Sequence, residues 1–364
     1  MKSARPVLDN FLRAVHREHP ERIPVASCIS SQYICDLYGV GVKDYLFDSH
    51  KKLEVQCAFQ DQWPELMIVP GIYPDFGCGV VEPSAFGCQL EQRENNPLSP
   101  KPLCPKLLQA QSLQTQGGAK SIEELARLKA PDPKKDGLLP RVLEEYRHFW
   151  SYLDKRYIDH YGYLDGFAFT MGPVETAAIV MGYENFLIGL HDYPDLIRRI
   201  LNMTTDFTIR WLKAQEGVNG TLKRVYFFDH TPARVGPAHF EEFVFPYIST
   251  VLEEFSYAIR IYHICEKNIL HVLPRMGELG IDVLYSAADF SVVKKKLGEK
   301  VCLMGNLSPI ELLRKGTPDE IRMQCRLLID AVSVPEGGYI LAPSGAYIPG
   351  TPEENIRAMI DSTK

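Results

Sequence analysis

The sequence predicts an α/β fold, a (β/α)8 TIM barrel with an N-terminal elaboration that occupies residues 1–364 as a single domain. Three observations support this class. The chain has 364 residues, of which 45% are hydrophobic, so it can bury one large core. Short apolar runs alternate with longer amphipathic runs over the C-terminal half, which is typical of parallel strands joined by helices. No glycine-rich phosphate fingerprint, the mark of many open nucleotide-binding sheets, follows any of these runs.

The N-terminal third begins with an amphipathic run over 7–18, which predicts a helix, and an apolar run over 22–30, which predicts a strand. A second pair follows, a helix over 49–63 and a strand over 65–71. Residues 71–137 are rich in Gly, Pro, Gln and Asn, so we predict irregular hairpins or a cap over the barrel mouth.

The C-terminal half continues the rhythm with six predicted strands, each followed by a loop. They cover 166–173, 224–231, 259–265, 282–289, 300–309 and 338–345. Helical patterns lie between them, with clear examples over 238–258 and 308–332. Six successive strand and helix units favour a closed barrel over an open sheet.

Composition narrows the range of functions. A formal charge of -6 gives no support for nucleic-acid binding, so small molecules or proteins are the expected partners. The first 25 residues scatter charge and lack an apolar core, so we expect no targeting peptide, and no run is long enough to cross a membrane. The nine cysteines are odd in number and irregularly spaced, which favours a reducing cytoplasm. The sequence leaves open whether the chain forms a homodimer.

Polar residues at the ends of the predicted strands form the candidate site, because such a barrel presents its chemistry at the carboxyl ends of its strands. Glu242 joins them, since it lies near the start of the helix after Pro237, on the same face, where the helix dipole favours a carboxylate. The strand-end residues are Asp229, His230, His263, Cys265, Asp289, Asn306 and Ser344.

Imidazole, thiolate and carboxylate groups are suitable zinc ligands, and a catalytic zinc site needs three of them with a fourth position open. The centre of this prediction is the stretch YHIC, in which His263 and Cys265 end one strand. A packing role fits the same spacing. In that case His263 bonds to a backbone carbonyl and Cys265 fills a small apolar space.

From about residue 165 onward the chain resembles the uroporphyrinogen decarboxylase superfamily, whose corrinoid-dependent methyltransferases share a TIM barrel. The stretches that carry the resemblance are HFEEFVFPYISTVLEEF, YHIC, LGEKVCLMGNLSP and GGYILAPSGAYIPGTPEENIRAMID. In the N-terminal third, RIPVA and DYLFD are compatible with the same superfamily.

The true decarboxylases of this superfamily carry an arginine-rich motif near the N-terminus and an aspartate beneath the pyrroles. This chain begins with RIPVASCISSQYICDLYG and has no such motif, so porphyrinogen decarboxylation is not expected. The thiol-methylating members bind zinc through H-x-C and a second cysteine in the last strand-end loop. His263 and Cys265 match the first part, whereas Gly345, beside Ser344, stands where the second cysteine would align.

A sister group that demethylates aromatic ethers has a zinc motif of two glutamates and a histidine, with twenty residues between the second glutamate and the histidine. Glu242 and His263 have this spacing, while Phe227 stands at the first glutamate's position and Asp229 is the nearest acid. The resemblance therefore implies zinc held by Glu242, His263 and either Asp229 or Cys265. Carboxylate and imidazole ligands leave zinc a strong Lewis acid toward a departing oxygen.

The favoured function is a zinc-dependent methyltransferase that moves a methyl group from a methoxylated aromatic to the Co(I) corrinoid of a partner protein. His230 would give a proton to the departing oxygen, and Asn306 and Ser344 would bind the donor by hydrogen bonds. The predicted pocket walls, which would stack on the donor ring, are Tyr33, Tyr73, Phe76, Phe167, Phe169, Met171, Tyr285 and Tyr347.

A separate corrinoid protein is implied, because the sequence shows no corrinoid-binding module, and residues 71–137 are the predicted docking rim. Two alternatives stay open. One is methyl transfer from a methylcobamide to a thiol such as coenzyme M. The other is a non-catalytic ligand-binding barrel that has lost its metal.

Overall fold

The computed structural model describes residues 5–92, 96–103, 122–297, 300–332 and 335–364. The strands are β1 (Val25–Ser27), β2 (Leu66–Ile68), β3 (Leu90–Glu91), β4 (Ser99–Pro100), β5 (Phe167–Met171), β6 (Arg224–Phe228), β7 (Ile259–Ile264), β8 (Val283–Ser286), β9 (Cys302–Leu307) and β10 (Tyr339–Pro343). The helices before β5 are α1 (Pro6–His16), α2 (Ser31–Tyr38), α3 (Val42–Phe47), α4 (Ser49–Gln62), α5 (Val81–Ala85), α6 (Ile122–Ala126), α7 (Leu139–Tyr152) and α8 (Lys155–Tyr161). Those after β5 are α9 (Pro173–Met181), α10 (Tyr183–Asp192), α11 (Pro194–Asn219), η2 (Thr231–Arg234), α12 (Pro237–Phe243), α13 (Phe245–Glu254), α14 (Leu273–Met276), α15 (Phe290–Leu297), η3 (Pro309–Arg314), α16 (Pro318–Val332) and α17 (Glu353–Asp361).

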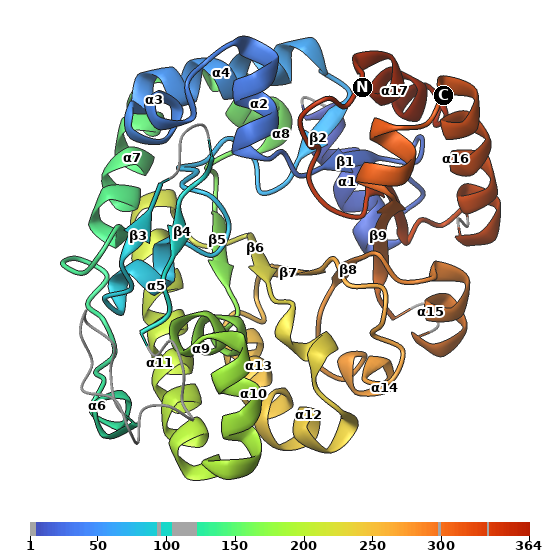
Figure 1. The fold of residues 1–364 in the computed structure, drawn as a ribbon. Coiled ribbons are helices and arrows are strands. Elements are labelled where there is room, and N and C mark those ends of the chain that lie inside the picture. Colours follow the sequence, from blue (N-terminus) through green and yellow to red (C-terminus); the bar gives the residue numbers. More distant parts are fainter. Residues whose placement is uncertain (1–4, 93–95, 104–121, 298–299, 333–334) are drawn as a thin grey trace.

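Eight parallel strands form one curled sheet in the order β2-β1-β10-β9-β8-β7-β6-β5 (Figure 1). Val25 of β1 pairs with Leu341 of β10, so the first and last strands of the chain lie side by side. Helices surround the sheet and connect its strands (Figure 1). This is the arrangement of a (β/α)8 barrel, and the predicted fold class is confirmed.

The two edge strands of this sheet, β2 and β5, are not paired with each other within the described residues. Side chains satisfy the free backbone groups of β5 instead. Gln215 of α11 accepts from the Phe169 nitrogen at 3.1 Å and donates to the Phe169 oxygen at 2.9 Å. Asn219, one helical turn later, donates to the Phe167 oxygen, and Glu82 accepts from the Met171 nitrogen. An edge that would otherwise expose its hydrogen-bonding groups is thus covered.

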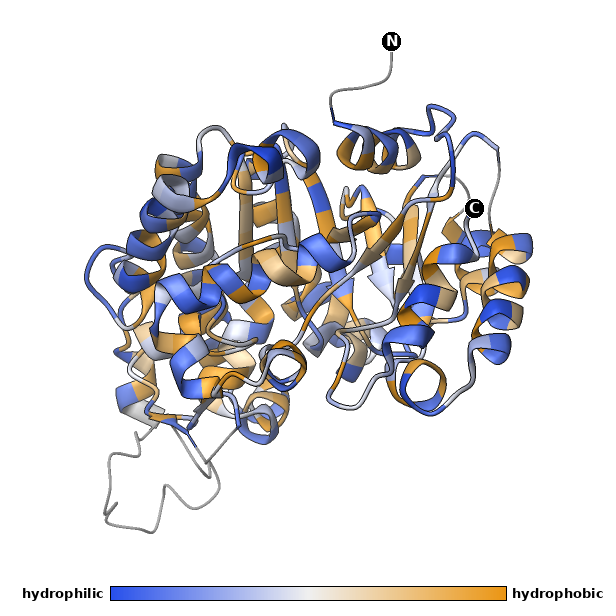
Figure 2. Cartoon of the chain, turned by 90° about the horizontal axis from the view of Figure 1, so that it is seen from above, coloured by the Kyte–Doolittle hydropathy of each residue, from blue (hydrophilic) through white to orange (hydrophobic). Residues whose placement is uncertain are grey.

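All six strands predicted in the C-terminal half are present as β5 to β10. Two predicted helices are each divided. The predicted helix over 238–258 breaks at Val244 because Pro246 starts a new helix, α13. The predicted helix over 308–332 breaks between η3 and α16, where Gly316 and Pro318 interrupt it. In Figure 2 most helices show both hydrophilic and hydrophobic segments, as expected of amphipathic helices that cover a barrel.

The chain between β2 and β5 contains the region predicted as a cap, 71–137. Its described parts include the short helix α5 and an antiparallel pair in which Leu90 lies opposite Pro100. Residues 93–95 and 104–121 of the predicted cap lie outside the described residues. In the described part of the chain, no helix has both the length and the apolar character needed to span a membrane.

Candidate functional site

A cavity of about 350 Å³ lies at the carboxyl ends of the barrel strands. This is the end at which such barrels carry their chemistry. Two larger depressions lie elsewhere, one at the amino ends of β1 and β2 and one between α15, η3 and α16, and neither contains a histidine or cysteine. The lining residues are Cys28, Ile29, Ser30, Ser31, Pro70, Tyr73, Asp75, Gly77, Cys78, Pro97, Phe169, Tyr226, Phe228, His230, His263, Cys265, Gly345 and Ala346.

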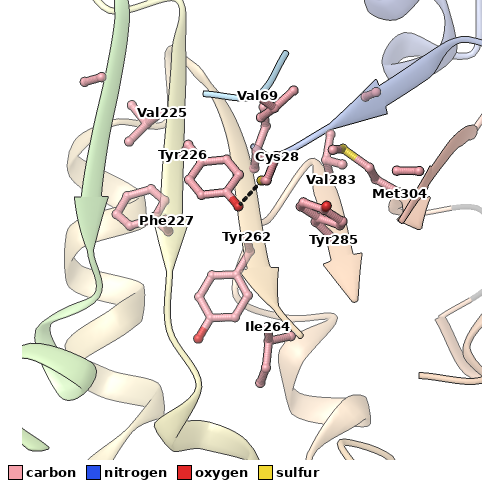
Figure 3. Close-up of a cluster of buried hydrophobic side chains, with 14 of the residues drawn as sticks. Cys28, Val69, Val225, Tyr226, Phe227, Tyr262, Ile264, Val283, Tyr285 and Met304 are labelled. Carbon is pink, nitrogen blue, oxygen red and sulfur yellow. Dashed lines mark hydrogen bonds between the residues drawn. The ribbon is translucent and has the colours of Figure 1, made fainter. Parts of the chain in front are cut away.

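His263 is the most deeply buried histidine of this cavity, at 3% exposed. Its Nδ1 is hydrogen-bonded to the hydroxyl of Tyr226, which in turn lies 3.1 Å from Sγ of Cys28 (Figure 3). The imidazole stacks on Tyr285 with ring centroids 4.1 Å apart and planes 15° apart. Its other nitrogen, Nε2, is buried and has no hydrogen bond in the described structure.

Burial and, to a smaller extent, the neighbouring His230 lower the pKa of His263 to about 3, while a hydrogen bond with the backbone of Ser344 acts in the opposite direction. The ring is therefore neutral near pH 7. A neutral imidazole with one nitrogen held by a hydroxyl and the other without a partner has the protonation state and orientation of a metal ligand.

His230 and Cys265 also line the cavity and contact each other, with Sγ of Cys265 3.3 Å from Nε2 of His230. Glu175 fixes the backbone around His230, because its carboxylate accepts from the nitrogens of His230 and Thr231 at 2.9 and 2.8 Å. Burial lowers the pKa of His230 and raises the pKa of the Cys265 thiol to about 12. The pair is therefore a neutral imidazole and a protonated thiol near pH 7.

Asp75 lies in the loop after β2 and is 4% exposed. Its Oδ2 accepts from the Tyr45 hydroxyl at 3.0 Å, and its Oδ1 accepts from the Gly77 nitrogen at 2.7 Å. Burial raises the pKa of this carboxyl group above its ordinary value. The same loop brings Cys78 to the cavity between Gly77 and Gly79, whose φ angles of 92° and 76° favour glycine.

Aromatic rings form one wall of the cavity. Tyr73 and Phe169 have ring centroids 5.6 Å apart, and Phe169 and Tyr226 have centroids 5.5 Å apart. Phe228 packs edge-on against His230 at 4.3 Å. These contacts make a surface suited to a flat apolar ligand.

Two predicted metal ligands do not reach this cavity. Asp229 lies between two cavity-lining residues of the same chain segment, Phe228 and His230, so alternation turns it to the outer side of the sheet. There it packs against Gly172, and burial raises its pKa well above the ordinary value. Glu242 lies on α12 with its side chain 49% exposed and paired with Arg198 of α11. Within the described residues, no three His, Cys, Asp or Glu side chains are placed closely enough to hold a metal ion.

The predicted hydrogen-bonding residues are also displaced from the cavity. Asn306 lines the outer groove beside α15, and its side chain donates to the Ala288 oxygen at 2.5 Å. Ser344 is buried, and its nitrogen donates to the Leu307 oxygen, whereas the next two residues line the cavity. The strand-end rule places the backbone correctly and leaves the direction of each side chain undetermined.

Of the predicted aromatic walls, Tyr73 and Phe169 line the cavity, and the others pack elsewhere. Tyr33 and Tyr347 pack against each other and Phe59 in the core. Phe167 lies at the amino end of β5 beneath the guanidinium of Arg224. Phe76 packs under the Lys52 ammonium, Tyr285 supports His263 from behind, and Met171 ends β5 beside Gly79.

The cavity residues that the strand-end prediction missed include Cys28, Asp75, Cys78 and Tyr226. Cys28 directly follows β1, and Asp75 and Cys78 lie in the loop after β2. Applying the rule to the first two predicted strands would have found these three. Tyr226 lies inside a strand, where its inward direction follows from alternation with Phe228.

Comparisons with known proteins agree with this fold. The sequence model of the family described as Uroporphyrinogen decarboxylase (URO-D) matches residues 7–364. The chain is 30% identical over 178 residues to a uroporphyrinogen decarboxylase of Prochlorococcus marinus, covering 47% of this chain and 48% of the relative. It is 26% identical over 239 residues to the enzyme of that name from Dechloromonas aromatica, covering 61% of this chain and 65% of the relative.

The chain is also 27% identical over 195 residues to the methylcobamide:CoM methyltransferase MtaA of Methanosarcina barkeri, covering 52% of this chain and 55% of the relative. These alignments therefore span about half to two thirds of the relatives' own lengths. Among solved structures, a methyltransferase from Methanosarcina mazei superimposes with a TM-score of 0.76 at 18% identity, covering 98% of this chain and 97% of that one. This likeness shows a shared fold.

Proposed function

The chain belongs to the uroporphyrinogen decarboxylase family, and from this premise we propose that it is a zinc-dependent methyltransferase. In this proposal it moves a methyl group from a small methoxylated aromatic to the Co(I) corrinoid of a partner protein. The similarity to a methylcobamide methyltransferase supports this branch of the family. We place the reaction in the cytoplasm, where the free thiols of the cavity stay reduced.

The observation that carries the proposal is the position of the H-x-C pair inside an aromatic cavity. His263 and Cys265 line the same space as Tyr73, Phe169 and Phe228. A volume of about 350 Å³ is near the lower end of the usual range for small-molecule sites, about 300–1,000 Å³. The cavity therefore suits a donor with a single ring that stacks on these aromatic side chains.

The imidazole, thiol and carboxyl groups that line the cavity are suitable zinc ligands, although within the described residues no three of them lie close enough, as placed, to hold the ion. His263 has a buried Nε2 without a hydrogen bond, and the Tyr226 hydroxyl holds its Nδ1, so the ring is oriented as in metal sites. Cys265 directly follows the strand that carries His263, and its thiol reaches the cavity. When bound there, zinc would act as a Lewis acid on the methoxy oxygen of the donor and lower the barrier to methyl transfer by several kcal/mol.

The reaction breaks the bond between the methyl carbon and the methoxy oxygen and leaves the electron pair of that bond on the oxygen, which becomes a phenolate. The corrinoid supplies the electron pair for the new bond to carbon. Asp75 lines the cavity, and because burial raises its pKa it holds a proton better than an exposed carboxyl group does. It can therefore give this proton to the departing methoxy oxygen. Asp75 therefore replaces His230 as the proposed proton donor, since burial lowers the pKa of His230 and leaves its ring neutral.

Methyl transfer to a thiol is the second candidate function, and the thiols of the cavity favour it. Cys28, Cys78 and Cys265 all line this space. A second thiolate near zinc would keep a substrate sulfur electron-rich. Porphyrinogen decarboxylation is less well supported, because the described lining of the cavity contains no Lys or Arg to pair with the acidic side chains of that substrate.

The test is an anaerobic assay of methyl transfer from guaiacol to cob(I)alamin. The reaction is monitored by the loss of the Co(I) absorbance and by the appearance of catechol. We expect transfer by the zinc-loaded protein and roughly a hundredfold or greater loss in His263→Ala, equal to the several kcal/mol that zinc supplies. His191→Ala is the matched control, because His191 is 85% exposed and pairs with Asp192. Zinc-loaded protein that methylates coenzyme M from methylcobalamin and ignores methoxylated aromatics would favour the second function. Binding of donors without any turnover would indicate a non-catalytic barrel.

A further inference from the structure

The H-x-C pair supplies two zinc ligands, whereas a catalytic zinc needs three from the protein. The structure excludes Glu242 and Asp229 from this role, because both lie away from the cavity. The remaining side chains with suitable atoms in the cavity are His230, Asp75, Cys28 and Cys78.

His230 is the one with a direct contact to the pair. Its Nε2 lies 3.3 Å from Sγ of Cys265. Zinc bonds of about 2.0–2.1 Å to nitrogen and about 2.3 Å to sulfur, at a tetrahedral angle, put these two ligand atoms about 3.5 Å apart. The observed separation is thus close to one edge of a tetrahedral zinc site.

The ring of His230 is also oriented toward this point. Glu175 holds its backbone nitrogen at 2.9 Å, and Phe228 packs edge-on against the imidazole. The centroids of His230 and His263 are 6.0 Å apart. As placed, His263 completes no group of three with His230 and Cys265, so metal binding would draw its partner-free Nε2 toward the other two atoms.

The other candidates are engaged differently. Both oxygens of the Asp75 carboxyl group already accept hydrogen bonds, from the Tyr45 hydroxyl and from the Gly77 nitrogen. Sγ of Cys28 lies against the Tyr226 hydroxyl, behind His263. Cys78 lies in the loop after β2, and within the described residues it makes no hydrogen bond to His230 or Cys265.

We propose that His230 is the third zinc ligand, so that the zinc site consists of His230, His263 and Cys265. This inference rests on the proposed function and specifies its metal centre. Two neutral imidazoles and one thiolate leave a net positive charge on the zinc site. Such a site acts on an oxygen leaving group more strongly than one with two thiolates, which favours ether demethylation over thiol methylation.

The test measures metal binding apart from catalysis. Zinc content and affinity are measured by plasma mass spectrometry and by competition with a chromophoric chelator, for wild type, His230→Ala, His230→Cys and the control His191→Ala. Loss of a ligand should exceed the roughly 10–100-fold effect of removing an orienting group, so His230→Ala should lose more than about 100-fold in affinity. His230→Cys should retain zinc, because cysteine is also a zinc ligand.

Cobalt(II) in place of zinc reports the ligand identities. The wild type should show the charge-transfer absorbance of a single thiolate, which Cys265→Ser abolishes and His230→Cys increases. Cys28→Ser and Cys78→Ser should leave it unchanged. Each variant is first checked for native circular dichroism, and His230→Cys keeps the test valid if His230→Ala fails to fold.

Stoichiometric zinc in both His230→Ala and wild type would overturn this inference and leave the proposed function standing. Loss of the thiolate band in Cys78→Ser would overturn it in favour of Cys78 as a ligand. A wild type without zinc would overturn the inference together with the zinc chemistry of the proposed function. Zinc lost in His230→Ala, with no methyl transfer by wild type, would support the metal site and refute the proposed function.

Discussion

Replacing Tyr226 by phenylalanine should weaken zinc binding although Tyr226 is not a ligand. Its hydroxyl is hydrogen-bonded to Nδ1 of His263 and lies 3.1 Å from Sγ of Cys28. Tyr226 and His263 are 2% and 3% exposed, so water cannot easily replace the hydroxyl that Tyr226→Phe removes. A buried nitrogen left without a partner costs about 1–3 kcal/mol. Groups that orient a ligand histidine change metal affinity about 10–100-fold.

We therefore expect zinc affinity to fall about 10–100-fold and the free energy of unfolding of the metal-free protein to fall by about 1–3 kcal/mol. Chelator competition measures the first quantity and urea denaturation the second. Tyr161→Phe is the matched control, because the Tyr161 hydroxyl is buried and donates to the Pro64 oxygen at 3.0 Å, before β2 and away from the cavity. It should cost about 1 kcal/mol of stability and leave zinc affinity unchanged. If Tyr226→Phe bound zinc as tightly as wild type, the hydroxyl would have no role in orienting His263.

Three further predictions concern the sheet edge, the proton donor and a buried ion pair. Gln215→Leu leaves the nitrogen and oxygen of Phe169 without their partners, so the free energy of unfolding should fall by roughly 2–4 kcal/mol in urea; a change under 0.5 kcal/mol would mean that water satisfies this edge. Asp75→Asn removes the proposed acid, so kcat for ether demethylation should fall about 10²–10⁴-fold. Because burial raises the pKa of Asp75, wild-type activity should be present below that pKa and decline as pH rises through it, a decline that steady-state pH profiles should not find in Asp75→Asn. Lys52 and Glu145 pair at 2.6 Å with exposures of 0% and 1%, so Lys52→Met should destabilise by about 3–5 kcal/mol, while adding Glu145→Leu should recover much of this loss in thermal unfolding.

The strands could be predicted because each is a short apolar run bounded by turn residues, a signal that depends on few neighbours. Helix interruptions were harder to predict. The break at Val244 depends on how Pro246 is accommodated, and a continuous amphipathic pattern runs through both sides of it. The open edge between β2 and β5 was not predictable, because its coverage by Gln215 depends on the packing of α11 against β5.

The sequence predicts part of the site because the predicted residues lie at the ends of strands, which can be recognised from short apolar runs. His230, His263 and Cys265 meet at one cavity because all three lie at the carboxyl ends of neighbouring strands and face the same side. The rule that selected them also selected Asp229, which differs from His230 by one position and therefore faces the opposite side of the sheet. Glu242 has the spacing expected from the resemblance, but its helix turns the carboxylate toward Arg198 and solvent. Spacing along the chain fixes which element carries a residue, and only the three-dimensional packing fixes its direction.

The arrangement divides the site between two parts of the barrel. The proposed metal ligands end β6 and β7, which lie inside the paired sheet, whereas Asp75 and Cys78 follow β2 at its open edge. A paired strand is held by its neighbours on both sides, so ligands at its end keep a fixed geometry. The loop after an edge strand has fewer such restraints. Here the Tyr45 hydroxyl, to which Gln56 donates, and the Gly77 nitrogen hold Asp75 instead. The proposed metal chemistry thus rests on the rigid part of the barrel, whereas the proposed proton donor Asp75 rests on a loop whose sequence can change without disturbing the sheet.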